Sequence, residues 1–361
     1  MRSILIMYSL LLAVMFVLPV LLMWQNLTPG LPLASPGYTL PVFREIEEED
    51  PVGERAYSLD DLSAAGDIFV RVYHPREQKV MEMNLEVYLA GVVAAEMPTS
   101  FSKEALKAQA VVARTYTLKK SRFFGGSGCA HHDHCADICT DSSHCQAWKD
   151  TADEPEKYQR IYHAVHETAG EVITFDDELI LSCYHSTCGG RTEDAATLWA
   201  GSELPYLQNR ECPFCCHSPY YRTEKMVAYE DATFLNRDGD GLPAAVSGGG
   251  TAAVVQVEEV TRGNRVSVLR IGDCSLTGPE ARELFSLPSA AFDVEVHGEG
   301  LLFENRGFGH GVGLCQYGAD GMARTGFAYE QIVLYYYPGV KMKTVYPDGE
   351  KELPLIVPPG E

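Results

Sequence analysis

An apolar helical pattern that ends on an acidic residue is the feature that most constrains this chain. In the stretch LEVYLAGVVAAEMP, successive members of the pattern lie four, three and four residues apart: Leu85, Leu89, Val92 and Glu96. This spacing places the four side chains on one face of a helix, the face that packs against the rest of the protein. Pro98 disfavours helical geometry at the preceding residue, so Glu96 is expected in the last turn. Burial and the negative end of the helix dipole both disfavour a charged carboxylate there, which predicts a raised pKa for Glu96.

A second helix is predicted directly after the first, with Asn84 and Ser102 as the N-cap residues of the two helices. The second helix carries a basic edge that includes Lys107 and Arg114. Such an edge is either a solvated charged face or a set of groups directed at an anion. For Arg114 we expect a role in binding substrate or orienting Glu96.

The remaining pattern predicts an α+β fold, because helices and strands neither alternate regularly nor form βαβ units. Strands are expected at residues 68–72, near residue 80 and at 171–175, and a hairpin is expected between 254–260 and 265–271. Further helices are expected at residues 156–168, 279–285 and 329–336.

The N-terminal region is expected to lie outside this fold. Ile4 to Trp24 form an almost unbroken apolar run, long enough to span a bilayer, and only Arg2 is charged before them. We predict a transmembrane anchor at residues 1–25 with Arg2 on the cytoplasmic side; a cleaved signal peptide is the alternative. A Pro-rich acidic linker at 26–65, a catalytic domain at 66–346 and a tail at 347–361 complete the predicted organisation.

The 361-residue chain carries 29 basic and 50 acidic residues, a net charge of −21. This balance argues against a nucleic-acid partner, because phosphate binding requires a basic surface. An uncharged polysaccharide is compatible with such a surface.

Three ordered blocks carry a family resemblance. The first joins EVYLAGVVAAEMP to KEALKAQAVVARTY, the second is YHSTCGGRTED from Tyr184, and the third is GFGHGVGLCQYGA from Gly307. Together they resemble the stage II sporulation protein D domain, which also occurs in amidase-enhancer proteins. The resemblance implies a membrane-anchored lytic transglycosylase that cuts peptidoglycan glycan strands during forespore engulfment, with Glu96 as its catalytic acid.

A lytic transglycosylase needs one carboxyl group, whereas most glycoside hydrolases use two. The same acid protonates the leaving oxygen and then accepts the proton of the muramic acid C6 hydroxyl, so the product ends in 1,6-anhydromuramic acid. The negative surface favours strands already stripped of their acidic peptides. Besides Arg114, we expect substrate contacts from Tyr184, Ser186 and His310; the alternative for His310 is a tight turn that packs against the Glu96 helix.

A Cys- and His-rich loop, residues 125–150, offers ligands for tetrahedral zinc. The motif CTDSSHC resembles the family's zinc loop, which implies a structural Zn²⁺ held by His134, Cys139, His144 and Cys145. Additional residues of the loop leave the ligand choice open: Cys129, His131, His132 and Cys135. Disulfides are the competing interpretation.

A second metal site is conceivable at Cys212, Cys215 and His217, where the cysteines have C-x-x-C spacing. The chain has 11 cysteines in all, an odd number that cannot pair completely within one chain.

The resemblance also implies partners and a location. The partners are peptidoglycan, the membrane, and the stage II sporulation proteins P and M. The catalytic domain is expected outside the cytoplasm, on the mother-cell membrane facing the intermembrane space. Two other functions remain open: a non-catalytic wall-binding protein that activates an amidase, and an extracytoplasmic metal-handling or redox protein.

Overall fold

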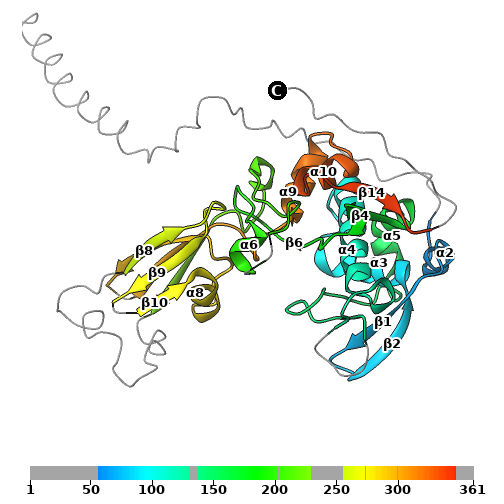
Figure 1. The fold of residues 1–361 in the computed structure, drawn as a ribbon, viewed down its shortest axis with the longest axis horizontal. Coiled ribbons are helices and arrows are strands. Elements are labelled where there is room, and N and C mark those ends of the chain that lie inside the picture. The colour runs from blue at the N-terminus through cyan, green and yellow to red at the C-terminus, as the bar shows by residue number, and fades with distance from the viewer. Residues whose placement is uncertain are drawn as a thin grey trace, which may run out of the picture. The chain divides into compact units, whose positions relative to one another are not determined.

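The computed structural model describes residues 56–129, 136–199, 201, 203–228, 255–272, 274–298 and 300–346. Helices are mixed with short sheets, so the predicted α+β class is confirmed (Figure 1). The predicted anchor at 1–25 and the tail at 347–361 lie outside the described residues, as does most of the predicted linker. Within the described ranges, no helix combines the length and apolar character needed to cross a membrane.

Helix α4 (Lys103–Lys120) is the centre of the helical part of the fold (Figure 1). It contacts four other helices and strand β4 (Glu171–Phe175). These helices are α3 (Leu85–Glu96), α5 (Gln159–Glu167), α9 (Gln316–Arg324) and α10 (Tyr329–Tyr336). The contact faces are built from small and aliphatic side chains that are fully buried, which allows the helix axes to approach closely.

The two predicted N-caps have different outcomes. The Asn84 side chain accepts hydrogen bonds from the Glu86 and Val87 amides at 3.0 and 3.3 Å, so the first cap is confirmed. Ser102 does occupy the N-cap position of α4, but its side chain makes no capping hydrogen bond. The predicted side-chain cap is therefore wrong. The Ser102 amide instead donates to Asp320 Oδ1 at 2.8 Å, so a residue of α9 holds the start of α4.

Two sheets flank the helices. Strand β1 (Phe69–His74) pairs antiparallel with β2 (Lys79–Asn84) and parallel with the short β3 (Ile138–Cys139), with Tyr73 opposite Cys139. This pairing ties the Cys- and His-rich loop to the sheet. Strand β4 lies between two antiparallel partners, β14 (Lys341–Thr344) and β5 (Glu178–Leu179).

Two further sheets share a separate hydrophobic core. The predicted hairpin is confirmed, since strands β8 and β9 pair antiparallel around Asn264, which has a positive φ of 58°. The elements of this part are β8 (Val255–Val260), β9 (Val266–Ile271), β10 (Cys274–Thr277), α8 (Gly278–Leu284), β7 (Thr223–Ala228), β11 (Phe292–His297) and β12 (Gly300–Asn305). Shorter elements complete the described fold: α2 (Leu59–Ala64), α6 (Ala195–Leu198) and 3₁₀ turns at Arg122–Phe124, Pro155–Tyr158 and Pro213–Cys215.

A two-stranded parallel pair brings the second and third sequence blocks together. Strand β6 (Tyr184–His185) pairs with β13 (Leu314–Cys315), and Thr187 forms an isolated bridge with Phe308. Gly307 has a φ of 81°, and a Cβ there would lie 2.4 Å from the Thr187 carbonyl oxygen, so only glycine fits this crossing. The two blocks therefore form one wall of a cleft.

Candidate active site

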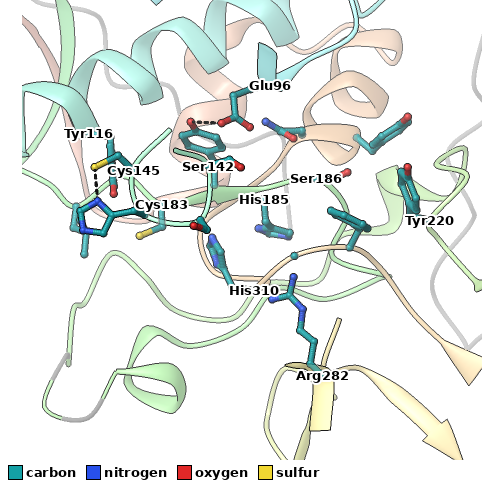
Figure 2. A pocket seen from close by; sticks show the side chains of 18 of the residues that line it. Glu96, Tyr116, Ser142, Cys145, Cys183, His185, Ser186, Tyr220, Arg282 and His310 are labelled. Carbon is teal, nitrogen blue, oxygen red and sulfur yellow. Dashed lines mark hydrogen bonds between the residues drawn. The ribbon is translucent and has the colours of Figure 1, made fainter. Parts of the chain in front are cut away.

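A cleft of about 1160 Å³ lies at the C-terminal end of α3. Glu96, Tyr184, Ser186 and His310 all line it, so the structure brings together four of the five residues predicted to act on substrate. Figure 2 shows Glu96 on one side of the cleft, with His185 and His310 on the other side and Arg282 beyond them. The cleft exceeds the roughly 300–1,000 Å³ typical of small-molecule sites, which suits an extended ligand.

The Glu96 carboxylate is held by three donors. The Ala147 amide donates to Oε1 at 2.8 Å and the Tyr184 hydroxyl donates to the same oxygen at 3.3 Å. The Gln316 side chain supplies a third hydrogen bond. Gln146 Nε2 in turn donates to the Tyr184 hydroxyl at 3.1 Å, so the tyrosine is itself oriented.

Burial raises the pKa of Glu96, as predicted from the sequence. The hydrogen bonds from Ala147, Tyr184 and Gln316 stabilise the charged form and act against this shift, but burial is the larger effect. The side chain is largely buried but keeps some exposure and lines the cleft. A carboxyl group in this environment keeps its proton closer to neutral pH, which is the requirement for a general acid.

Among the described residues that line the cleft, Glu96 is the sole carboxylate. The charged groups that share the walls with it are the cations Lys120 and Arg282. The described cleft therefore lacks the carboxylate pair on which most glycoside hydrolases rely.

Two of the histidines that line the cleft, His185 and His310, are neutral hydrogen-bonding groups. Burial, with a smaller effect from Arg265, lowers the pKa of His310 to about 4, and burial lowers the pKa of His185 well below its usual range. His310 Nδ1 accepts the Val312 amide at 3.1 Å, and His185 Nδ1 lies 3.2 Å from the Val312 carbonyl oxygen. Neither ring carries a proton to donate as an imidazolium at neutral pH.

Aromatic side chains form the exposed rim of the cleft. Trp199, Tyr220 and Phe308 are 38%, 39% and 41% exposed, and all three line the cavity. The rings of Tyr220 and Phe308 lie 4.7 Å apart between centroids. Grouped exposed aromatic side chains are typical of binding surfaces, and their flat faces suit the C–H faces of sugar rings.

Arg114 corrects a sequence prediction. Its side chain is fully buried and forms two hydrogen bonds with Glu86, at 3.0 Å from Nε and 2.6 Å from Nη2. It does not line the cleft, so it contacts neither substrate nor Glu96. The sequence placed Arg114 on the correct helix, but the charged partner on α3 was not recognised.

A cluster of sulfur and imidazole ligands, which we call cluster 1, lies beside the cleft. It consists of Cys129, Cys139, His144 and Cys145, whose ligand atoms lie within 4.8 Å of one another. His144 Nδ1 lies 3.4, 3.4 and 3.2 Å from the three sulfur atoms, taken in chain order. Three of the four predicted zinc ligands are present, and Cys129 supplies the fourth; His134 lies outside the described residues.

Cluster 1 is connected to Glu96 through two residues that directly follow it. Gln146 orients Tyr184, and the Ala147 amide binds Glu96. The loop therefore carries the ligands of cluster 1 and also two residues that position Glu96, one directly and one through Tyr184. Backbone amides carry no sequence signal, so Ala147 could not be predicted.

Several cleft residues were not identified from the sequence. Gln316 lies within the third block, which offered a signal, while the rim residues Trp199, Tyr220 and Phe308 and the cation Arg282 were not recognised. Whether these residues reach the cleft depends on the pairing of β6 with β13 and on the position of α8, which the sequence does not reveal.

Comparison with known proteins gives a consistent result. Residues 73–175 match the family model described as Stage II sporulation protein. The chain is 34% identical over 286 residues to "Stage II sporulation protein D" of Bacillus subtilis (strain 168), covering 77% of this chain and 80% of that protein. It is 32% identical over 281 residues to the protein of the same name from Bacillus amyloliquefaciens, covering 76% and 78%. It is also 24% identical over 300 residues to "Amidase enhancer" of Bacillus subtilis (strain 168), covering 70% of this chain and 40% of that protein.

Proposed function

Because the chain belongs to the stage II sporulation protein D family, we propose that it is a lytic transglycosylase that cleaves peptidoglycan glycan strands during sporulation. The observation that carries this proposal is the environment of Glu96. It is the single carboxylate among the described cleft residues, burial raises its pKa, and exposed aromatic side chains line the same cleft.

The reaction begins with a protonated Glu96. It donates its proton to the oxygen that links muramic acid to the next sugar, and the bond between that oxygen and the anomeric carbon breaks. The C6 hydroxyl of the same muramic acid attacks the anomeric carbon, and its proton passes to the Glu96 carboxylate. The acid is restored, one glycosidic bond is exchanged for an intramolecular one, and no water is consumed.

An intramolecular nucleophile explains how one carboxylate is sufficient. The C6 hydroxyl is already attached to the reacting ring, so proximity replaces the water that a second carboxylate would activate. Tyr184 and the Ala147 amide fix the position of the carboxylate, and we expect Ser186 and His310 to contact the sugar.

The substrate that fits best is a glycan strand without peptides. The net charge of −21 repels a peptide-free strand less than a strand that carries acidic stem peptides. The exposed rings of Tyr220 and Phe308 provide an apolar surface on which successive sugars can lie.

Cluster 1 fits a structural zinc ion. Three thiolates and one imidazole are a standard tetrahedral ligand set, and four protein ligands leave no open coordination position. An ion there would stabilise the loop that carries Gln146 and Ala147, while the chemistry stays with Glu96.

We place the enzyme on the outer face of the mother-cell membrane, with residues 1–25 as anchor. The apolar run from Ile4 to Trp24 supports this location. The expected partners are the stage II sporulation proteins P and M.

A non-catalytic activator is the second candidate function. It rests on the 24% identity to a protein named amidase enhancer. The presence of an acid with a raised pKa in the cleft favours the enzyme.

The test compares the native chain with Glu96→Gln on peptide-free glycan strands, using mass analysis of the product ends. The native chain should release 1,6-anhydromuramic ends, and Glu96→Gln should be slower by at least about 100-fold while still binding strands, because the amide is not acidic enough to transfer a proton to the leaving oxygen. Glu178→Gln is a matched control, since that side chain is 84% exposed and outside the cleft.

Two results would contradict the proposal. Reducing ends from the native chain would mean that water is the nucleophile. Strand binding without cleavage, together with stimulation of an amidase, would establish the activator function.

A further inference from the structure

Four cysteines from distant parts of the chain meet in the interior, and we call them cluster 2. They are Cys188, Cys212, Cys215 and Cys315, with exposed fractions of 2%, 0%, 0% and 0%. Their sulfur atoms all lie within 4.8 Å of one another. The ten cysteines among the described residues are all free thiols, these four included.

The spacing of the sulfur atoms matches a metal site. Zinc–sulfur bonds of about 2.3 Å at tetrahedral angles place neighbouring sulfur atoms about 3.8 Å apart, and Cys188 and Cys215 are separated by 3.5 Å. A disulfide needs about 2.05 Å and joins sulfur atoms in separate pairs. In cluster 2, each of the four sulfur atoms lies within 4.8 Å of the other three, which is the arrangement of four ligands around one centre.

Donors and a buried cation surround the sulfur atoms. The amides of Cys188 and Gly318 both donate to Cys315 Sγ at 3.3 Å, and the Tyr336 hydroxyl lies 3.1 Å from Cys212 Sγ. Arg265 is 2% exposed and donates to the Cys188 carbonyl oxygen at 3.4 Å. Its Nε and Nη1 have no hydrogen-bond partner among the described residues.

These surroundings suit an anionic centre. Amide and hydroxyl donors directed at sulfur stabilise bound thiolates in metal sites. Four thiolates around one divalent cation carry a net charge of −2, and the Arg265 guanidinium neutralises part of it. Glu193 is the other buried counter-charge near Arg265, and the four thiolates would add to the compensation for the lost hydration of this cation.

We propose that cluster 2 binds a second structural Zn²⁺, separate from cluster 1. Binding releases the four thiol protons, and four protein ligands close the coordination sphere. The sequence pattern offered His217 as a ligand beside Cys212 and Cys215, but His217 Nε2 lies 3.0 Å from Asp320 Oδ2 instead. Cys188 and Cys315 complete the site.

The position of cluster 2 gives the ion a consequence for the cleft. Cys315 directly precedes Gln316, a hydrogen-bond partner of Glu96, and Cys188 follows shortly after Tyr184 and Ser186. An ion here would join the second block, the 212–215 turn and the start of α9. It would hold the wall of the cleft that the second and third blocks form.

The experiment measures zinc per chain by plasma mass spectrometry on the full-length protein, purified in detergent without reductant or chelator. Cys212→Ser/Cys215→Ser should carry one equivalent less than the native chain. The control Cys216→Ser/Cys274→Ser removes two exposed thiols and should carry the same amount as the native chain. Equal zinc in the cluster 2 variant and the native chain would overturn the proposal.

Two further measurements apply even if the cluster 2 variant fails to fold. Peptide mapping of the native chain without reduction should show all four cysteines unlinked; a disulfide within the set would overturn the proposal. Cys139→Ser/Cys145→Ser, loaded with Co²⁺, should show the absorption of a tetrathiolate cobalt site. Its absence, or iron in place of zinc, would also overturn it. Metal content is measured apart from glycan cleavage, so this test and that of the proposed function fail independently.

Discussion

At the scale of single residues, the decisive balance is at Glu96. Three hydrogen bonds favour the carboxylate, and burial disfavours it by more, so the pKa is raised. Each donor therefore adjusts the pKa of Glu96, and the loss of one donor should leave Glu96 able to act as the acid. The raised pKa predicts a rate that falls as the pH rises through it, because the protonated form starts the reaction.

Tyr184→Phe tests this tuning. The substitution removes a hydrogen bond that lowers the pKa of Glu96, so the pKa should rise further and the alkaline limb of the pH–rate profile should move to higher pH. The rate is measured across the limb by release of anhydro ends.

Tyr116→Phe is the control for this prediction. Tyr116 lines the same cleft but is not a hydrogen-bond partner of Glu96 among the described residues. Its alkaline limb should stay in place. A limb that moves to lower pH in Tyr184→Phe would show that the tyrosine does not stabilise the carboxylate.

Prediction from the sequence found residues that the structure brings together in the cleft where they lie in recognisable motifs. Glu96 was identified from its place on a buried helical face, and Tyr184, Ser186 and His310 were found in Gly-rich blocks. Arg114 was misassigned because one sequence shows a charge on a helix but not its partner. Glu86, 28 positions earlier, looked like an ordinary first-turn acid.

At the scale of elements, α3 owes its small residues to the loop that crosses it. A Cβ on Gly91 would lie 2.1 Å from Trp148 Nε1 and 2.6 Å from the Lys149 carbonyl oxygen. The Lys149 amide also donates to the Gly91 carbonyl oxygen at 3.3 Å. The helix glycine thus makes room for the segment that delivers Ala147 to Glu96.

Gly91→Ala should therefore destabilise the protein, although alanine is the better helix former. The clash involves backbone and should cost about 1–3 kcal/mol, opposing the ~1 kcal/mol that alanine normally contributes within a helix. Urea unfolding measures the stability, and the cleavage rate at low urea should fall because the Ala147 amide is displaced.

Gly298→Ala serves as the comparison, because a Cβ there has no neighbour within 4 Å. It should leave both stability and rate unchanged. A stabilised Gly91→Ala protein with full activity would show that the loop does not depend on this glycine.

Element-level prediction was accurate for regular segments. The β8–β9 hairpin, β4, α3 and α10 were all expected from periodicity and turn residues. The parallel β6–β13 pair was not expected, because strands of two residues show no periodicity. Its paired residues, Tyr184 and Leu314, are also 130 positions apart in the sequence. The cleft wall depends on that pair.

At the scale of the whole molecule, the buried Glu86–Arg114 ion pair connects segments across the chain. Glu86 Oε1 also accepts the Gly170 amide at 3.2 Å and the Tyr346 hydroxyl at 3.1 Å. Arg114 further donates to the Glu171 carbonyl oxygen at 3.1 Å. The pair thus joins α3, α4, the start of β4 and the segment after β14.

Arg114→Met should lower the free energy of unfolding by about 3–5 kcal/mol, because Glu86 is left charged and buried without its cation. Adding Glu86→Gln should restore much of the loss. The cleavage rate per folded molecule should be unchanged, as Arg114 lies away from the cleft. Urea unfolding and rates below the transition provide both measurements.

The control for Arg114→Met is a partly exposed ion pair on the same helix. Lys103 pairs with Glu167 at 2.8 Å and is about one-third exposed. Lys103→Met should cost less than about 1 kcal/mol. Equal losses for the Arg114 and Lys103 variants, or a drop in rate confined to Arg114→Met, would contradict the structural role of Arg114.

The presence of one carboxylate, Glu96, among the described cleft residues also bears on how such proteins diversify. Where two acids share the chemistry, losing one often leaves partial or altered reactivity; where one acid does all of it, a single codon change at position 96 would abolish cleavage and leave the aromatic rim intact. The result would be a protein that still recognises glycan strands. A cleft of this design can therefore give rise to enzymes and to binding proteins within one lineage, separated by one mutational step.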